Sequence, residues 1–199
     1  MKDERFVTGL EVQFEMHVGD KEVLLLLDPH SNEMPYLVGY CTVNGLGMEQ
    51  LTELVGGNDY LEAVEEFMTR VQGQVDQVRS DRALSDEPQE VFGKEYCLPG
   101  GLEQDLNGRV VILKPETLRP EYQNIAHQLL FVHGGFGAAP NGRGTAVFAT
   151  NVFSGEKRDC RRHEIAGILN PIHAPDWVKP GVEAIRAQQK AKGGKPHER

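Results

Sequence analysis

The stretch most suggestive of chemistry is a glycine-rich segment that directly follows an apolar run. It reads Phe-Val-His-Gly-Gly-Phe-Gly over residues 131–137 and Asn-Gly-Arg-Gly over residues 141–144. Consecutive glycine N–H groups can form a concave anion-binding nest, and an arginine beside the nest adds positive charge. The candidate anion site consists of His133, Gly134, Gly135, Gly137 and Arg143. The competing interpretation, which the sequence favours, is a wide hairpin connection whose glycines permit positive φ and close backbone packing.

Two catalytic or nucleotide-binding loops have similar patterns, but neither pattern is completed. An apolar strand followed by His-Gly-Gly is typical of the oxyanion loop of lipase-like hydrolases, which also need a G-x-S-x-G elbow. The only serine after Gly137 is Ser154, and it lacks the first glycine of that elbow. Residues 137–144 approach the spacing of a phosphate-binding loop, but Arg143 replaces the lysine, Gly144 replaces the hydroxyl residue, and a β-like run follows. The sequence therefore predicts neither acyl transfer nor a known nucleotide-binding loop.

A short basic segment surrounds Cys160, and nearby cations are expected to lower the pKa of that thiol and raise its reactivity. A small enzyme or ligand sensor is therefore one alternative, which requires His133, Arg143 and Cys160 to converge in a single cleft. The default interpretation is that Cys160 is a strand residue beside a basic surface stripe, formed by Lys157, Arg158, Arg161 and Arg162. This stripe is the best internal candidate for contact with phosphate or an acidic protein. Few aromatic residues interleave this stripe, so stacking on single-stranded nucleic acid is not indicated.

The spacing of histidine and cysteine predicts no metal centre, and the sequence predicts no bound cofactor. The seven histidines show no H-x-x-x-H or H-x-H spacing, and the three cysteines form no C-x-x-C pair. A metal site assembled in three dimensions from His133, Cys160 and His163 is the remaining option. No local nucleophile–base pair is present, so no catalytic residue is predicted.

Charge is distributed unevenly along the 199 residues. Residues 1–90 carry a net charge of −13 and residues 91–199 carry +4, for a total of −9. Such asymmetry suggests two units with different surroundings. The basic excess lies in residues 179–199, which we expect to form a partly disordered terminal tail. A helix over residues 182–192 is an alternative with weak periodicity.

The N-terminal part has the pattern of a small antiparallel sheet. Residues 6–17, 21–27 and 36–43 are apolar and β-rich, and a Gly-Asp turn joins the first two runs, which predicts a three-stranded meander. Four consecutive leucines, Leu24 to Leu27, interrupt the alternation of apolar and polar residues. The second strand is therefore expected to be buried on both faces.

Two helices are expected after this meander. Residues 47–55 are predicted to form a short helix that ends at Gly56, and Asn58 is predicted to cap a longer helix. The longer helix carries one apolar stripe, formed by Leu61, Val64, Met68, Val71, Val75 and Val78. This stripe is expected to cover a face of the meander.

The polar segment 79–90 contains almost no large apolar side chain, so we place a boundary there. Beyond it, short β-like runs occur at residues 109–113, 125–133, 145–153, 157–162 and 165–169, with a helical turn at 114–118. The expected fold class is α+β with two β-rich units, the second a small antiparallel sheet or partly open barrel. The expected domains are an acidic unit at 1–82, a connector at 83–108, a β-rich unit at 109–178 and a basic tail at 179–199.

A series of short motifs in the second half resembles one family. The motifs are Leu-Lys-Pro-Glu at 113–116, Gly-Gly-Phe-Gly at 134–137, Arg-Gly at 143–144, Val-Phe at 147–148, Gly-Glu at 155–156 and Arg-Arg at 161–162. In this order they resemble a small module in uncharacterised accessory proteins of bacterial conjugative plasmids and transposons. The resemblance covers residues 110–177, and the N-terminal half is more weakly similar to accessory proteins of the same elements. No activity is established for this family, so the resemblance implies a context only.

These patterns predict a non-enzymatic binding or adaptor protein of a mobile genetic element. We expect a protein partner, whereas direct nucleic acid binding has weaker support because the acidic half repels a phosphate backbone. One alternative is an acidic anti-defence protein that mimics nucleic acid, with carboxylates within residues 49–90 lining one surface. Another alternative is the enzyme or ligand sensor with a site at the glycine-rich segment. The short apolar runs and the polar first residues predict a cytoplasmic protein without membrane contact.

Overall fold

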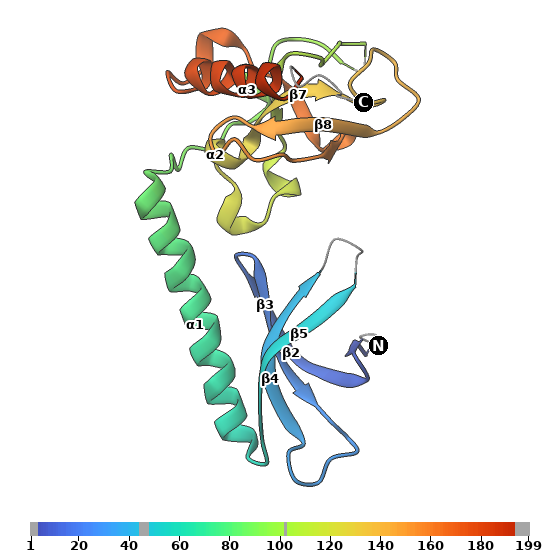
Figure 1. Ribbon diagram of the computed structural model, residues 1–199, viewed down its shortest axis with the longest axis vertical. Helices are drawn as coiled ribbons and strands as arrows, with labels where there is room; N and C mark the ends of the chain where they lie inside the picture. The colour runs from blue at the N-terminus through green and yellow to red at the C-terminus, as the bar shows by residue number, and fades with distance from the viewer. Residues whose placement is uncertain (1–3, 44–47, 102, 194–199) are drawn as a thin grey trace, which may run out of the picture. The chain divides into compact units, whose positions relative to one another are not determined.

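The computed structural model describes residues 4–43, 48–101 and 103–193, and the chain divides into two compact units. The first unit comprises residues 1–86 and the second comprises residues 87–199. Each unit contains one five-stranded antiparallel sheet and at least one helix, so the fold class is α+β (Figure 1).

The sheet of the first unit is a meander in which each strand pairs with the next along the chain. Its strands are β1 (Phe6–Val7), β2 (Leu10–Val18), β3 (Lys21–Leu27), β4 (Tyr36–Val43) and β5 (Glu49–Gly57). The turn between β2 and β3 uses Gly19, whose φ of 67° is accessible to glycine at little steric cost. The sheet curls into an open half-barrel (Figure 1).

The central strand β3 is buried on both of its faces, as the leucine run predicts. Val23 and Leu25 face the helix α1 (Tyr60–Ser85), which contributes Ala63 and Phe67 to the same apolar cluster. On the opposite side, Leu24 and Leu26 pack with Val7 and Cys41 inside the curl. Because β3 contributes to both clusters, it is the strand on which the two layers of this unit depend.

The structure corrects the prediction of a short helix at residues 47–55, because this segment forms the edge strand β5. β5 pairs with β4 along most of its length, and Gly39 on β4 leaves room for the side chain of Leu54. A side chain at Gly39 would place its Cβ 2.7 Å from the Leu54 side chain. Tertiary pairing with β4 therefore decides the conformation of this segment.

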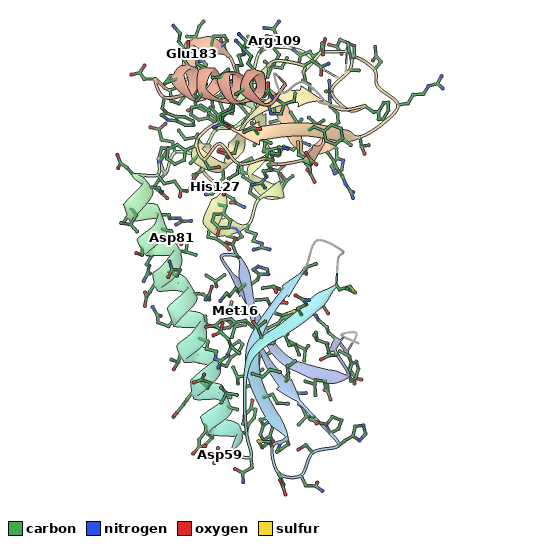
Figure 2. The ribbon with its side chains drawn as sticks, in the orientation of Figure 1. Met16, Asp59, Asp81, Arg109, His127 and Glu183 are labelled. Atoms are coloured by element: carbon green, nitrogen blue, oxygen red, sulfur yellow. The ribbon has the colours of Figure 1, made fainter. Side chains whose placement is uncertain are left out.

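The long helix begins one residue later than predicted and is rotated relative to the predicted stripe. Asp59, not Asn58, is the N-cap, and its carboxylate accepts hydrogen bonds from the N–H groups of Leu61 and Glu62 (Figure 2). The side chains of Leu61 and Met68 are 70% and 59% exposed, whereas Phe67 is buried and contacts the ring of Phe14. Val64 and Val71 of the predicted stripe do pack on the sheet.

One arginine connects three strands of the first unit. The guanidinium of Arg5 donates to Glu15 at 2.6 Å, to Glu22 at 2.8 Å and to Glu49 at 2.6 Å. These glutamates belong to β2, β3 and β5. Hydrogen bonding to Glu22 raises the pKa of Arg5 above its ordinary value, so the side chain stays charged throughout the accessible pH range.

Replacing Arg5 by glutamine is expected to lower the free energy of unfolding by about 1–2 kcal/mol, because three carboxylates then share one region without a cation. Added salt should recover part of this loss by screening their repulsion. Urea unfolding at two salt concentrations measures both effects. The matched control is Arg79→Gln, since Arg79 is 71% exposed and pairs with Asp76 on its own helix. Equal urea midpoints for the two variants would contradict the structural role of Arg5.

The sheet of the second unit has the order β10-β6-β7-β8-β9, and all of its neighbouring strands are antiparallel. Its strands are β6 (Val110–Leu113), β7 (Leu129–Gly134), β8 (Ala146–Asn151), β9 (Cys160–Arg161) and β10 (Ile165–Ile168). Both faces are buried near the centre. One face packs Leu130, Val147 and Cys160 in a cluster, and the other packs Leu129 and Phe131 beneath the helix α3 (Val178–Gly193).

Several local predictions for the second unit need correction. Residues 125–133 are not one strand, because a short helix α2 (Ile125–Gln128), capped by Asn124, precedes β7. Much of the expected terminal tail is the helix α3, whose Val178 and Ile185 are buried against the sheet. The tail prediction for residues 194–199 lies outside the described residues.

The expected connector also contains ordered structure. Residues 83–85 are the last residues of α1, which ends at Asp86 in a left-handed conformation (φ 49°). Phe92 and Leu106 are buried in the second unit, and the side-chain amide of Gln128 bonds both the N–H and the carbonyl of Phe92. Within the described part of the second unit, five single-turn 3₁₀ helices link the other elements: η1 (Lys94–Tyr96), η2 (Pro115–Thr117), η3 (Pro120–Tyr122), η4 (Arg162–Glu164) and η5 (Pro171–His173).

Candidate functional site

The glycine-rich segment forms the connection between β7 and β8, and its glycines permit close backbone contacts. Gly135 has a φ of 107°, which disfavours other residues. A Cβ at Gly135 would collide with the carbonyl of Ala146, and a Cβ at Gly137 would collide with the carbonyl of Thr145. These contacts support the interpretation of a wide hairpin connection over that of an anion nest. Arg143 is exposed on this loop.

The guanidinium of Arg162 holds this loop against a second one. It donates to the carbonyl oxygen of Gly137 at 2.7 Å and to that of Gln104 at 2.9 Å. Burial lowers the pKa of Arg162, although Asp105 and Glu103 partly offset that effect. The structure therefore places Arg162 as a link between two loops rather than as a free cation of a surface stripe.

The other three cations of the predicted stripe lie along β9 and the residues before it. Lys157 is paired with Thr150 by an isolated bridge, and Arg161 lies opposite Ala146. Both side chains are exposed. The N–H of Arg158 donates to the carbonyl of Ala149, and this side chain is half-buried.

The structure does not bring His133, Arg143 and Cys160 into one cleft. His133 contacts Thr150 at 2.7 Å and Gln189 of α3 at 2.5 Å, so it lies on the face of the sheet that α3 covers. Partial burial and the charge of Lys157 lower the pKa of His133. Cys160 belongs to the apolar cluster on the opposite face. His133 and Cys160 of the predicted enzyme site therefore lie on opposite faces of the sheet.

The expected activation of Cys160 by its basic neighbours is wrong. Burial raises the pKa of this thiol to about 11, and the charge of Glu164 adds to the effect of burial. Arg158 lowers the pKa, but it does not offset the other contributions. Desolvation decides the sign because the thiol lies in an apolar cluster.

Cys160 is accordingly expected to resist alkylation in the folded protein. At pH 8 a thiol with a pKa of about 11 is only about one part in a thousand thiolate, and burial also excludes the reagent. Iodoacetamide should label the half-buried Cys97 first, as measured by peptide mass spectrometry. Denatured protein, in which all three cysteines react, is the control. Labelling of Cys160 ahead of Cys97 in the folded state would contradict this prediction.

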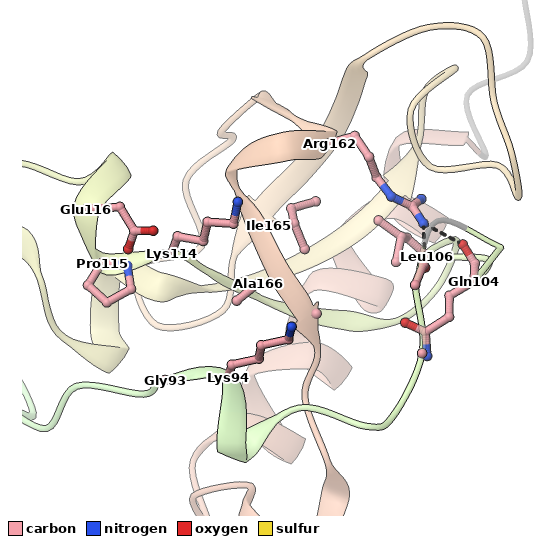
Figure 3. A pocket seen from close by; sticks show the side chains of 13 residues that line it. Gly93, Lys94, Gln104, Leu106, Lys114, Pro115, Glu116, Arg162, Ile165 and Ala166 are labelled. Carbon is pink, nitrogen blue, oxygen red and sulfur yellow. Dashed lines mark hydrogen bonds between the residues drawn. The ribbon is translucent and has the colours of Figure 1, made fainter.

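A pocket of about 540 Å³ opens on the second unit beside Arg162 (Figure 3). It lies among η1, the loop after it, the end of β6, η2 and the start of β10. Its wall is formed by Gly93, Lys94, Gly100, Gly101, Gln104, Leu106, Lys114, Pro115, Glu116, Arg162, Ile165, Ala166 and Gly167. Gly167 lets β10 approach Cys97, because a Cβ there would lie 2.8 Å from the Cβ of Cys97.

Two lysines give this pocket its charge. Lys94 belongs to η1, and Lys114 directly follows β6 as the N-cap of η2. Figure 3 shows the two ammonium groups extending from different walls toward Ile165 and Ala166 of β10. Among the described residues, no carboxylate lies within ion-pair distance of either ammonium group. Glu116 is the only acidic residue in the described wall of the pocket. The wall is therefore suited to an anion.

No local pattern in the sequence identifies this pocket, because Lys94 is 20 residues from Lys114, and Lys114 is 48 residues from Arg162. Lys114 does fall within the Leu-Lys-Pro-Glu motif at 113–116, and Gly100 and Gly101 form a recognisable turn. Neither feature identifies Lys94 as the partner of Lys114. Only the folded arrangement of η1, β6 and β10 places them around one cavity.

Part of the acidic charge of the first unit is neutralised locally. Glu49 pairs with Arg5, Glu53 with Lys21, and Glu66 with Arg70. The carboxylate of Asp59 is used in capping α1. A surface that mimics nucleic acid needs free carboxylates, and these pairings leave fewer of them in the first unit.

The described residues contain neither a metal-binding cluster nor a membrane-spanning helix. No group of three His, Cys, Asp or Glu side chains in residues 4–43, 48–101 and 103–193 has a geometry that holds a metal ion. Within the same ranges, no helix is both long and apolar enough to span a bilayer.

Comparisons with protein-family models, with curated proteins and with solved structures found no match to this chain. The resemblance to accessory proteins of plasmids and transposons therefore stays a prediction.

Proposed function

We propose that this chain is a non-enzymatic binding protein whose second unit binds a small anionic ligand in the Lys94–Lys114 pocket. The observation that carries the proposal is the pair of ammonium groups without ion-pair partners in one cavity. A carboxylate or a phosphate is the ligand group that such a pair attracts. The prediction of a protein partner in a mobile-element context stays open beside this proposal.

The dimensions of the pocket agree with a small-molecule site. Its volume of about 540 Å³ lies within the range of known ligand pockets. Leu106, Ile165 and Ala166 form an apolar part of the wall, and the charged groups stand around it. Glu116 can accept a hydrogen bond from a hydroxyl or amino group, so a ligand with both an anionic group and a donor fits best.

The composition of the wall supports binding rather than catalysis by a hydroxyl or thiol nucleophile. Among the described lining residues there is no serine, threonine, cysteine or histidine, so Ser–His, Cys–His and threonine-based nucleophile–base pairs are absent there. The guanidinium of Arg162 is already engaged with backbone carbonyls and forms a fixed part of the wall.

The proposal predicts that Lys94→Ala and Lys114→Ala each weaken anion binding by about five- to tenfold, because each removes one charge-assisted contact. Isothermal titration with inorganic phosphate and with citrate measures the affinity. Native mass spectrometry of the purified protein shows whether an anion copurifies.

The matched control is Lys179→Ala, which removes an exposed lysine outside the pocket. It should leave unchanged both the affinity and any excess mass that a copurified anion adds to the protein. The proposal is wrong if neither anion binds, or if Lys179→Ala weakens binding as much as Lys114→Ala does.

A further inference from the structure

The strand β2 forms an edge of the first unit's sheet over most of its length. β1 pairs only with Leu10 and Glu11 at the start of β2, and the N–H of Val12 donates to the carbonyl of Arg5. Over residues 13–18, no described residue pairs with the outer side of β2. A free edge of this kind presents unpaired N–H and C=O groups, which can pair with a further strand.

The other edges of the two sheets carry features that discourage such pairing. β1 and β9 have only two residues each. β5 is interrupted by Glu53, whose φ of 54° is left-handed, at the point where the register with β4 shifts. The chain beyond β10 is bridged by Cys97, which pairs with Leu169. Short strands, bulges and covering segments protect edges, whereas residues 14–18 of β2 show none of them and contain no proline or lysine.

Two apolar side chains stand exposed at this free edge. Phe14 and Met16 lie opposite Leu25 and Val23 of β3, so they share the face of the sheet that packs on α1 (Figure 2). Phe14 is 49% exposed and Met16 is 47% exposed, whereas their partners on β3 are fully buried. Phe14 also contacts the buried ring of Phe67. The apolar layer beneath α1 therefore continues to the edge of the sheet and ends there without a cover among the described residues.

The hairpin between β2 and β3 fixes which main-chain groups point to the free edge. Residues 19–20 form a two-residue loop, and Val18 pairs with Lys21 across it. The pair that flanks such a loop is hydrogen-bonded, and hydrogen-bonded and non-hydrogen-bonded pairs alternate along an antiparallel ladder. His17 and Glu15 are therefore in non-hydrogen-bonded pairs with β3. Their N–H and C=O groups point outward, where a further strand can bind them.

The residues of this edge are complementary to themselves in one antiparallel register. With a two-fold axis beside Met16, Glu15 of one copy lies opposite His17 of the other. In the same register Phe14 lies opposite Val18, so apolar residues meet on the α1 face. Each pair of Glu15 and His17 exchanges main-chain hydrogen bonds and sets a carboxylate acceptor beside an imidazole N–H donor. An axis beside Glu15 instead places two carboxylates directly opposite each other, which is destabilising.

We propose that β2 pairs with β2 of a second copy of this chain, which joins the two five-stranded sheets across a two-fold axis beside Met16. A two-fold contact uses the same surface on both copies, so every favourable pair occurs twice. The contact covers Phe14 and Met16 and satisfies the outward main-chain groups of both copies. Residues 14–18 contain one carboxylate and one imidazole, so they do not select a strongly charged partner. The dimer involves the first unit and does not depend on the anion pocket.

Sedimentation equilibrium of the full chain, at up to about 100 µM, measures the dimer. Salt of about 150 mM screens the net negative charge of the two copies. Met16→Lys should weaken the dimer about tenfold, because it sets two ammonium groups at the axis. His17→Glu should weaken it by a similar factor, because it twice places a carboxylate opposite Glu15. His17→Lys should strengthen it a few-fold, which a misfolded variant cannot do. Met34→Lys is the matched control, because Met34 is 53% exposed in the same unit but lies outside β2.

Cysteine substitution tests the register directly. Met16→Cys places two thiols across the axis in a non-hydrogen-bonded pair, where a Cα–Cα distance of about 4.5 Å permits a disulfide. Gln13→Cys is the matched control, because Gln13 is exposed on the same strand but lies about 20 Å from its counterpart in this register. After mild oxidation, a non-reducing gel should show a linked dimer for Met16→Cys only. The unsubstituted protein shows what the native cysteines contribute, and circular dichroism confirms that each variant is folded.

The proposal is supported if the chain dimerises, the His17 variants shift the dimer in opposite directions, and only Met16→Cys is linked. Three results would overturn it: a monomer over the whole concentration range, a dimer that Met16→Lys leaves intact, or equal linking of the two cysteine variants. The first result would leave the edge to a strand of another protein. The second would place the contact between copies on a different surface.

Discussion

The guanidinium of Arg162 holds the two loops on which the organisation of the second unit depends. It joins the carbonyl of Gly137, in the glycine-rich connection, to the carbonyl of Gln104, at the border of the anion pocket. Irregular backbone must find hydrogen-bond partners outside the strand ladders, and a multivalent donor can serve several carbonyls together. A partly desolvated cation is stabilised by the same dipoles. One side chain therefore positions both a pocket wall and a loop that are distant in sequence.

Those parts of the fold that local composition determines were predictable. β3 combines apolar residues with no alternation, so its burial on both faces follows from the sequence alone. β5 was not predictable, because Leu51, Leu54 and Val55 have helical spacing and only pairing with β4 makes them a strand. The phase of α1 was also missed, because Phe67 is buried through a contact with Phe14 of a distant strand.

The candidate site depends almost entirely on tertiary structure. Counting charges near Cys160 gave the wrong direction for its pKa, because burial outweighs the neighbouring arginine. The glycine-rich segment was visible in the sequence, but its glycines permit contacts with the Ala146 and Thr145 carbonyls rather than forming a recognisable ligand cradle. Lys94 and Lys114 carry no common motif, and they share a cavity only because η1 and the end of β6 meet beside β10.

The path of α3 explains why the second unit has one covered and one open region on the same side of its sheet. A helix has a single apolar stripe, and the buried Val178 and Ile185 are two turns apart on that of α3. The single apolar stripe of α3 covers β7 but does not extend across β8 to β9. Polar contacts from Arg186 and Gln189 then fix the helix over Phe131 and His133. Phe148 is consequently left exposed by the geometry of helix-on-sheet packing, and an exposed ring in a strand is available for a contact outside the fold.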